Sequence, residues 1–288
     1  MKPVCKNYVD LSEFVTKEPR RKKKGFIKMK LSAISIFIVC FMMTVVILVG
    51  EAAQWKDSVI LYFPLDAVQG NKVIDSSPKN NDGEVTGNVK VVEGKFNKAF
   101  QFGTANDYVH IKNFKGMEDI SQWSATAWVN MTKSTTADTL ICAIGNGEAF
   151  RWNLGVYPGE IFHTNTCINS TWSSELNKTR AGEIVGKWVH MAAVYNVKDK
   201  SRTLYLNGKQ SHNDNLLQGN ATLTEIRIGA GQSNFVTWPW EGAIDDIAVF
   251  NTVLTENDIN DIMNGINLSV ESLGKLTTMW GHIKQYPE

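Results

Sequence analysis

The sequence predicts an all-β protein, a two-sheet antiparallel β-sandwich preceded by one hydrophobic helix. Three observations support this fold class. Short β-rich runs recur every 10 to 20 residues from Trp55 onward, turn-forming residues separate these runs, and helical periodicity is almost absent between them. The apolar fraction of 43% and the charged fraction of 20% are those of an ordinary globular chain, so a hydrophobic core is expected.

The expected strands are short and end at residues that favour turns. One of them, Thr203 to Leu206, alternates and runs into Asn207-Gly208, a pair typical of a two-residue hairpin turn. A single helix is expected over Thr255 to Met263, because Thr255 can cap it and apolar residues follow at helical spacing. The expected strands are Val59 to Phe63, Lys90 to Val92, Ala99 to Phe102, Tyr108 to Ile111, Ser124 to Met131, Leu140 to Ile144, Trp188 to Tyr195, Arg202 to Leu206, Glu225 to Ile228 and Gly242 to Phe250.

The first 53 residues form a separate kind of segment. Residues 1–30 are a basic region, and residues 31–53 contain the uncharged run LSAISIFIVCFMMTVVILVG. This run is long enough to cross a bilayer as a helix, which favours a signal anchor, while Gly50 and Ala52 fit a signal-peptidase site. Both alternatives place the body outside the cytoplasm by the positive-inside rule, secreted or anchored by residues 31–50. Met29 offers a second start, in which case residues 1–28 are a misassigned start.

The charge is divided unevenly along the chain. The first 53 residues hold 10 Lys and Arg against 4 Asp and Glu, which leaves 20 against 25 in the remainder. A mildly acidic body argues against a nucleic-acid partner, because such a partner needs a clustered positive surface. Contact with a membrane is expected only through the N-terminal segment.

Two cysteines, Cys142 and Cys167, lie in the body. Export would place them where a disulfide can persist, so a bridge between them is one interpretation. The other is that Cys142, within an apolar run, is a buried small hydrophobe. A zinc site is disfavoured, since His163 and Cys167 have no second pair of ligands beside them.

Six sequence blocks, in order, resemble the laminin G-like jelly-roll domains of the concanavalin A-like lectin/glucanase superfamily over roughly Val59 to Met263. The resemblance implies two antiparallel sheets packed face to face, a fold that hosts lectins, adhesion modules and hydrolases alike. The blocks are Leu61 to Asp66 with Val73 to Gly83, Gly94 to Phe102 with Asp107 to Val109, Ser124 to Val129, Trp188 to Tyr195, Leu204 to Gly208 with Ile226 to Gly229, and Gly242 to Asn251.

Catalytic signatures are missing from the sequence. Hydrolases of the laminarinase type in this superfamily carry Glu-x-Asp-x-x-Glu on one strand, and no such motif occurs here. Neither Gly-x-Ser-x-Gly nor His-Glu-x-x-His occurs. The sequence therefore predicts a protein that is not an enzyme.

The resemblance also implies a structural calcium ion, because many relatives bind one near the meeting point of the first and last strands. Asp245 matches the aspartate at the start of the last strand, with Asp66 and Asp107 as companions. The alternative is that these carboxylates only cap turns or accept backbone amides.

Aromatic residues that the core does not explain are the candidates for ligand contact. Trp152, Tyr157, Trp172 and Trp238 lie in or beside residues 146–180 and 231–239, where an exposed ring can stack on a sugar. Asn153, Asn169 and Asn234 are nearby hydrogen-bonding groups. The alternative is that the four rings close the open end of the sandwich.

These observations divide the chain into residues 1–30, 31–53, a jelly-roll domain over 55–265 and a C-terminal extension over 266–288. The function that they favour is an exported, non-catalytic binding module, most simply for carbohydrate, with calcium supporting its loops. A protein-binding adhesion or structural surface protein is the alternative. A glycoside hydrolase with an unrecognised site is the third reading.

Overall fold

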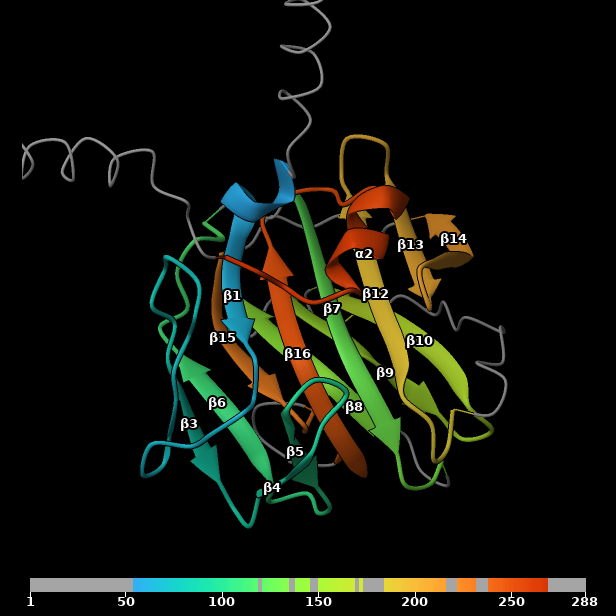
Figure 1. Ribbon diagram of the computed structural model, residues 1–288. Coiled ribbons are helices and arrows are strands. Elements are labelled where there is room, and N and C mark those ends of the chain that lie inside the picture. The colour runs from blue at the N-terminus through green and yellow to red at the C-terminus, as the bar shows by residue number, and fades with distance from the viewer. Residues whose placement is uncertain are drawn as a thin grey trace, which may run out of the picture. The chain divides into compact units, whose positions relative to one another are not determined.

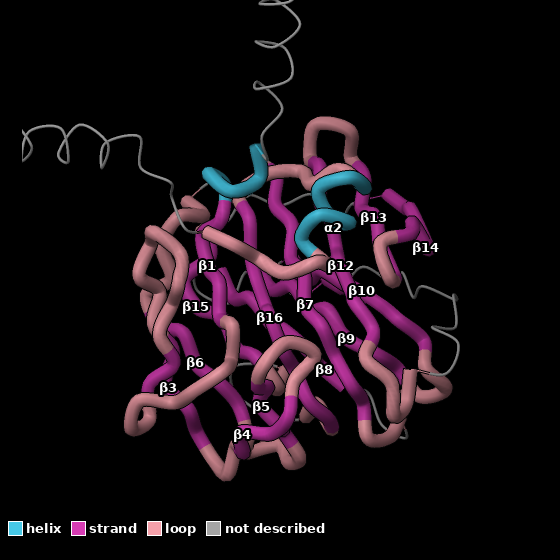
Figure 2. The backbone as a smooth tube through the Cα atoms, in the orientation of Figure 1, coloured by secondary structure: helices cyan, strands magenta, loops and turns pink. Residues whose placement is uncertain are grey.

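A computed structural model describes residues 54–118, 121–134, 138–145, 150–168, 171–172, 184–215, 222–231 and 238–268. The predicted basic region, the hydrophobic segment and residues 269–288 of the C-terminal extension therefore lie outside the described residues. Strands make up most of the described chain, and helices are short (Figure 2). None of the helices within the described ranges has the length and apolar character needed to cross a bilayer.

The strands form two antiparallel sheets of eight strands each, which confirms the predicted sandwich (Figure 1). Sheet A runs in the order β14 (Lys209–Asn215), β13 (Ser201–Leu206), β12 (Val189–Asn196), β7 (Gln122–Met131), β16 (Gly242–Phe250), β5 (Lys98–Phe102), β4 (Lys90–Glu93), with β1 (Val59–Phe63) paired to β16. Sheet B runs in the order β11 (Thr171–Trp172), β10 (Ile161–Ile168), β9 (Phe150–Tyr157), β8 (Asp138–Gly145), β15 (Leu223–Ile228), β6 (Tyr108–Lys112), β3 (Gly83–Thr86), β2 (Lys72–Val73).

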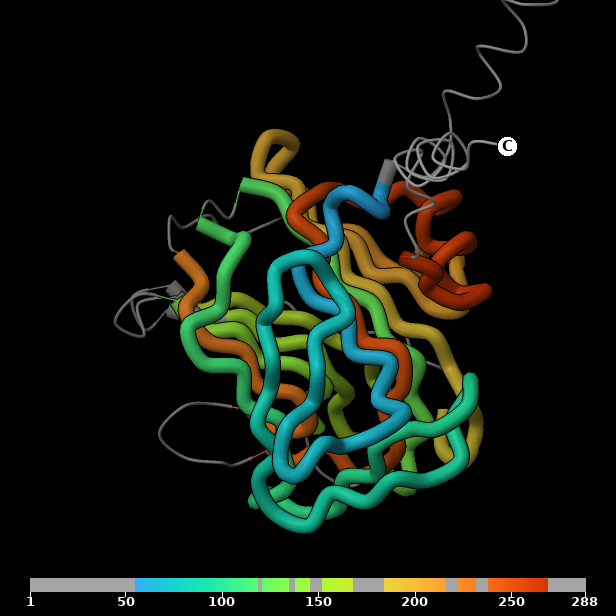
Figure 3. The backbone as a smooth tube through the Cα atoms, turned by 60° about the vertical axis from the view of Figure 1, so that its left-hand side comes forward, coloured from blue at the N-terminus to red at the C-terminus, as the bar shows by residue number. Residues whose placement is uncertain are grey.

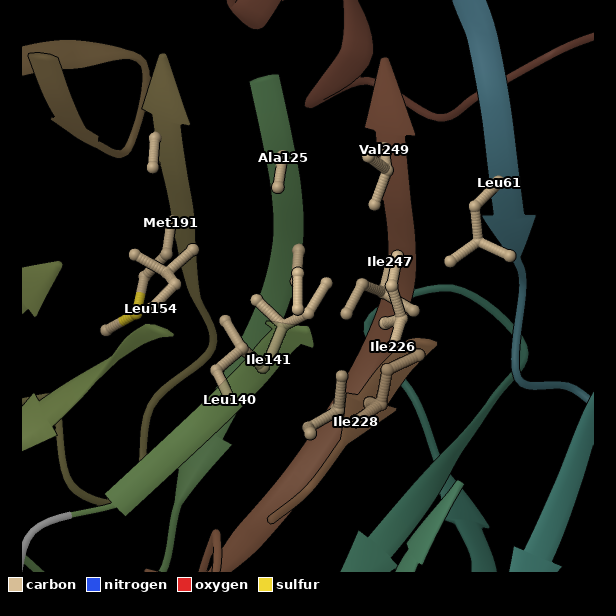
Figure 4. Packing of buried hydrophobic residues seen from close by; sticks show 14 of the residues in the cluster. Leu61, Ala125, Leu140, Ile141, Leu154, Met191, Ile226, Ile228, Ile247 and Val249 are labelled. Carbon is tan, nitrogen blue, oxygen red and sulfur yellow. The ribbon is translucent and has the colours of Figure 1, made fainter. Parts of the chain in front are cut away.

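The core lies between the two sheets, where apolar side chains from each inner face interdigitate (Figure 4). Burial of one such Leu or Ile contributes about 1.5–3 kcal/mol, so this layer is the main source of stability. Sheet A contributes Leu61, Ala125, Met191, Ile247 and Val249, and sheet B contributes Leu140, Ile141, Leu154, Ile226 and Ile228.

The outer face of sheet A is covered in part by the two helices. Helix α2 (Glu256–Ile262) begins at the predicted cap Thr255, whose hydroxyl and the Asp258 carboxylate form a capping box. The 3-10 helix η1 (Gln54–Ser58) lies beside it, and Trp55 Nε1 donates to Asp261 over 2.9 Å. A second apolar cluster, which includes Ile259 and Ile262, fills the space beneath them. Figure 3 shows α2 on the side of sheet A that faces away from sheet B.

The predicted disulfide is not formed. Cys142 on β8 and Cys167 on β10 are both buried, and the structure does not join them. Strand β9 lies between β8 and β10, so the two cysteines are separated by two strand spacings, about 9.5 Å. A disulfide requires Cα atoms within about 7 Å. The alternative interpretation, two buried thiols, is the one that the structure supports.

A hydrogen-bonded loop fixes β1 to the loop after β2. The Asp75 carboxylate accepts from the amides of Tyr62 (2.9 Å) and Asn81 (2.7 Å), and also from the amide and hydroxyl of Ser77. The Asn81 side chain in turn donates to the carbonyl of Ile60 over 2.7 Å. The turn at Asn80-Asn81-Asp82-Gly83, which belongs to the first block of the family resemblance, therefore has a structural role here.

We expect Asp75→Ala to lower the free energy of unfolding by about 3 kcal/mol, because it leaves buried amides without an acceptor. Urea denaturation of the variant measures this loss. Asp82→Ala is the matched control, because Asp82 is exposed and, among the described residues, accepts only the amide of Asp75, so its cost should stay below about 1 kcal/mol. Equal costs for the two variants would contradict this role of Asp75.

Candidate functional site

The side chains of β9 alternate between the two faces of sheet B, and this alternation determines which of them lie on the outer face. Trp152, Leu154 and Val156 point into the core, so Asn153 and Tyr157 project from the opposite face. Pairing extends this polar face across the sheet. Asn153 lies opposite Asn165 on β10 and Cys142 on β8, and Gly155 lies opposite His163 on β10 and Thr139 on β8.

Three polar atoms on this face are buried and have no hydrogen-bond partner among the described residues. They are Asn153 Oδ1, Asn165 Oδ1 and His163 Nδ1. The Tyr157 ring stacks on the imidazole of His163, with ring centroids 3.7 Å apart, and its hydroxyl accepts from Asn165 over 3.4 Å. Buried polar atoms in native proteins are almost always satisfied, so this face lacks a polar partner.

The imidazole of His163 is neutral at ordinary pH. Burial, and then the nearby Arg202 guanidinium, lower the pKa of His163 to about 3. One ring nitrogen of a neutral imidazole accepts a hydrogen bond and the other donates. Together with the two asparagine amides, His163 therefore offers both donors and acceptors without a charge.

Trp238 lies at the same end of this face as Tyr157. Its carbonyl accepts from the amides of Thr139 (3.3 Å) and Gly231 (3.2 Å). The indole packs closely there, because a Cβ placed on Gly231 would lie 3.1 Å from its Cε3 atom. As a residue, Trp238 is half-buried.

The four predicted ligand-contacting aromatics are therefore placed differently. Tyr157 and Trp238 lie at one end of the outer face of sheet B. Trp152 is only 1% exposed and packs in the core against Trp123, with ring centroids 4.0 Å apart, so the expectation of an exposed indole is wrong for this residue. The backbone of Trp172 pairs with Cys167, and its side chain lies outside the description. Asn169 and Asn234 lie outside the described residues.

A comparison with known protein families shows to which family this chain belongs. A model of the concanavalin A-like lectin/glucanases superfamily matches residues 102–260. The chain belongs to this superfamily. No curated protein matches the chain.

Solved structures with the same fold include the following three. The binding domain of Paraclostridial mosquitocidal protein 1 is 16% identical, with a TM-score of 0.57 over 73% of this chain and 53% of that one. Domain 4 of AbnA, a GH43 extracellular arabinanase from Geobacillus stearothermophilus, was solved with arabinotriose; it is 18% identical, with a TM-score of 0.56 over 71% of this chain and 98% of that one.

The third structure, of botulinum neurotoxin type C, concerns the toxin's interaction with two ganglioside molecules. It is 16% identical, with a TM-score of 0.57 over 75% of this chain and 53% of that one. This chain thus spans about half the length of the matched toxin chains. At such identities the likeness shows a common fold.

The three aspartates that membership of the superfamily suggested for calcium do not meet. Asp107 accepts the amides of Asn88 (2.7 Å) and Thr104 (2.9 Å). Asp66 accepts the amide of Lys98 over 2.9 Å. Over the described ranges, no three or more Asp, Glu, His or Cys side chains form a group that would hold a metal ion.

Asp245 has a pKa shifted far from its ordinary value. It is fully buried on β16, and its Oδ2 accepts the amide of Phe96 over 2.9 Å, while Oδ1 has no partner among the described residues. Burial raises the pKa of Asp245 to about 7, and the neighbouring Asp246 carboxylate acts in the same direction. Backbone amides, that of Phe96 first, oppose the shift. The protonated acid is therefore favoured up to neutral pH.

We expect the stability of Asp245→Asn to rise relative to the wild type between about pH 5 and pH 8. The folded-state pKa of about 7 lies above the ordinary value of 3.8, so the folded chain holds a proton that the unfolded chain releases. That stabilisation is complete below pH 3.8 and is lost as the pH rises through about 7. Urea denaturation at both pH values measures the difference.

The exposed Asp199→Asn on the β12–β13 turn is the control, and its stability relative to the wild type should not depend on pH over this range. A pH-independent difference for Asp245→Asn would contradict the raised pKa.

Proposed function

We propose that this chain is a non-catalytic carbohydrate-binding module whose ligand lies on the outer face of sheet B. The observation that supports this most directly is the set of buried atoms of Asn153, Asn165 and His163 that have no hydrogen-bond partner among the described residues, on a face whose one end carries Tyr157 and Trp238. Each unsatisfied buried group costs about 1–3 kcal/mol. A ligand with many hydroxyl groups would remove that cost.

The choice of face follows from how each sheet is covered. Helices α2 and η1 pack on part of the outer face of sheet A through an apolar cluster. Sheet B has no such apolar cluster on its outer face in the described ranges, where asparagine, histidine and tyrosine side chains occur instead. Recognition of a polar ligand is therefore better supported on sheet B.

The chemistry of the face suits a sugar. Amide groups and a neutral imidazole both donate to and accept from hydroxyls, and an aromatic ring packs against the C–H groups of a pyranose or furanose. Sites of this kind combine aromatic surface with a few convergent polar groups. The match covers 98% of AbnA domain 4, which was solved in complex with arabinotriose, and this likeness supports glycan recognition as the proposal.

Binding without catalysis is part of the proposal. The laminarinase-type Glu-x-Asp-x-x-Glu motif is missing from the sequence. The superfamily includes glucanases, so turnover has to be measured directly. Release of reducing sugar from any bound polysaccharide would replace this proposal with a hydrolase.

We expect the full chain to bind neutral oligosaccharides on a glycan array and Tyr157→Ala to weaken that binding about tenfold, since an aromatic anchor is worth more than about 1 kcal/mol. Isothermal titration with the best array ligand measures the change. Val91→Ala is the control, because Val91 is 45% exposed on β4 of the other sheet. A glycan-insensitive protein partner would favour the adhesion alternative.

The residues present do not fit the predicted calcium ligand set. Calcium binding therefore remains an expectation that rests on the family resemblance alone. Asp107 accepts a backbone amide on each of its two oxygens, and the three aspartates are not gathered. Thermal unfolding in excess calcium and in chelator checks it. A higher midpoint with calcium would support a structural ion, and identical midpoints would exclude one.

We also propose export of the body, on the strength of the basic region and the apolar run at residues 31–50. Fractionation of the expressed full chain tests this. Recovery of the body only with the cytoplasmic fraction would contradict it.

A further inference from the structure

A cavity of about 300 Å³ lies on the sheet A side, away from the proposed sugar face. Its walls come from β1, β16, the β4–β5 hairpin and residues 264–267. The segment after α2 runs back across β16 toward β1, which brings residues 264–267 over the sheet (Figure 1). The volume is at the lower end of the range for small-molecule sites.

The charged groups lining this cavity are all acidic. Asp66 and Asp246 line it, and no Lys, Arg or His is among its described lining residues. Each of these carboxylates uses Oδ1 within the protein: Asp66 accepts the Lys98 amide, and Asp246 accepts the Tyr62 hydroxyl over 2.6 Å. The described structure shows no hydrogen bond to Oδ2 of either residue, so both atoms remain for a ligand.

No cation among the described lining residues balances the negative charge at this cavity. Burial raises the pKa of the Tyr62 hydroxyl, and the carboxylates of Asp246, Asp245 and Asp66 raise it further. Two nearby cations are engaged elsewhere, because Lys98 Nζ pairs with Glu93 and Lys95 Nζ lies 4.2 Å from the ring centroid of Trp128. Burial raises the pKa of Asp246, and the Asp66 carboxylate acts in the same direction, so a bound cation would offset the repulsion between these two carboxylates.

The remaining walls suit an organic cation better than a bare metal ion. Tyr62 and Phe96 contribute aromatic surface, and Pro64 and Ile266 contribute aliphatic surface. A metal ion gains nothing from aliphatic walls and requires several oxygen ligands at fixed short distances. An alkylammonium group is attracted both to carboxylates and to aromatic rings.

We propose that this cavity binds a small organic ammonium group. Its nitrogen lies near Asp66 and Asp246, and its carbon substituents pack against Tyr62 and Phe96. Asp246 holds a left-handed backbone conformation (φ 46°) at the irregularity in β16, next to the buried Asp245. The site is separate from the outer face of sheet B, so it does not depend on the sugar-binding proposal.

The test is isothermal titration of the full chain with choline, ethanolamine, calcium chloride and 3,3-dimethyl-1-butanol, the uncharged isostere of choline. We expect saturable binding of choline or ethanolamine and none of the neutral alcohol. Asp246→Asn should weaken binding at least about tenfold, which corresponds to about 1.4 kcal/mol. Asp199→Asn, on the exposed β12–β13 turn, is the matched control and should leave binding unchanged.

Asp66→Asn is the second variant in case Asp246→Asn does not fold, because Asp66 is only half-buried. Three results would overturn the proposal: calcium binds and neither amine does, the neutral alcohol binds as well as choline, or no probe binds. The first would identify a metal site, and the second an apolar pocket without charge recognition.

Discussion

The two-residue periodicity of β9 and β10 is the constraint on which the proposed sugar site depends. Burial of Trp152, Leu154 and Val156 against the other sheet forces Asn153 and Tyr157 onto the outer face. A shift of register by one residue would place the asparagine in the core and the indole in solvent. The core packing therefore selects which polar groups a ligand can meet.

Much of the fold was predictable because its strands alternate and end at turn residues, and the cap at Thr255 was identified from its sequence alone. No strand was expected in residues 146–180, whereas this segment contains β9, β10 and β11. Apolar residues at every second position from Trp152 to Val156 were the signal for a strand. The pairing that brings Asn165 and His163 beside Asn153 depends on strand order, which spacing along the chain does not reveal.

The aspartates show the same limit. The family resemblance implied one ion shared by Asp66, Asp107 and Asp245, but each of these carboxylates accepts local backbone amides. Asp246, which was not singled out, lines the cavity because the strand is irregular between Asp245 and Ala248. A β-bulge re-aims a side chain in a way that a period-two pattern cannot anticipate.

The hydrogen bond between Trp55 and Asp261 joins the first described helix to the last one, so both ends of the body are fastened at one place. Tension applied between residues 54 and 268 would act first on the Trp55–Asp261 hydrogen bond and on the apolar contacts beneath α2. The hydrogen bonds between the strands would bear it afterwards. The two layers would be shielded from stretching. A domain held by its ends in this way can be tethered under load without distorting its opposite surface.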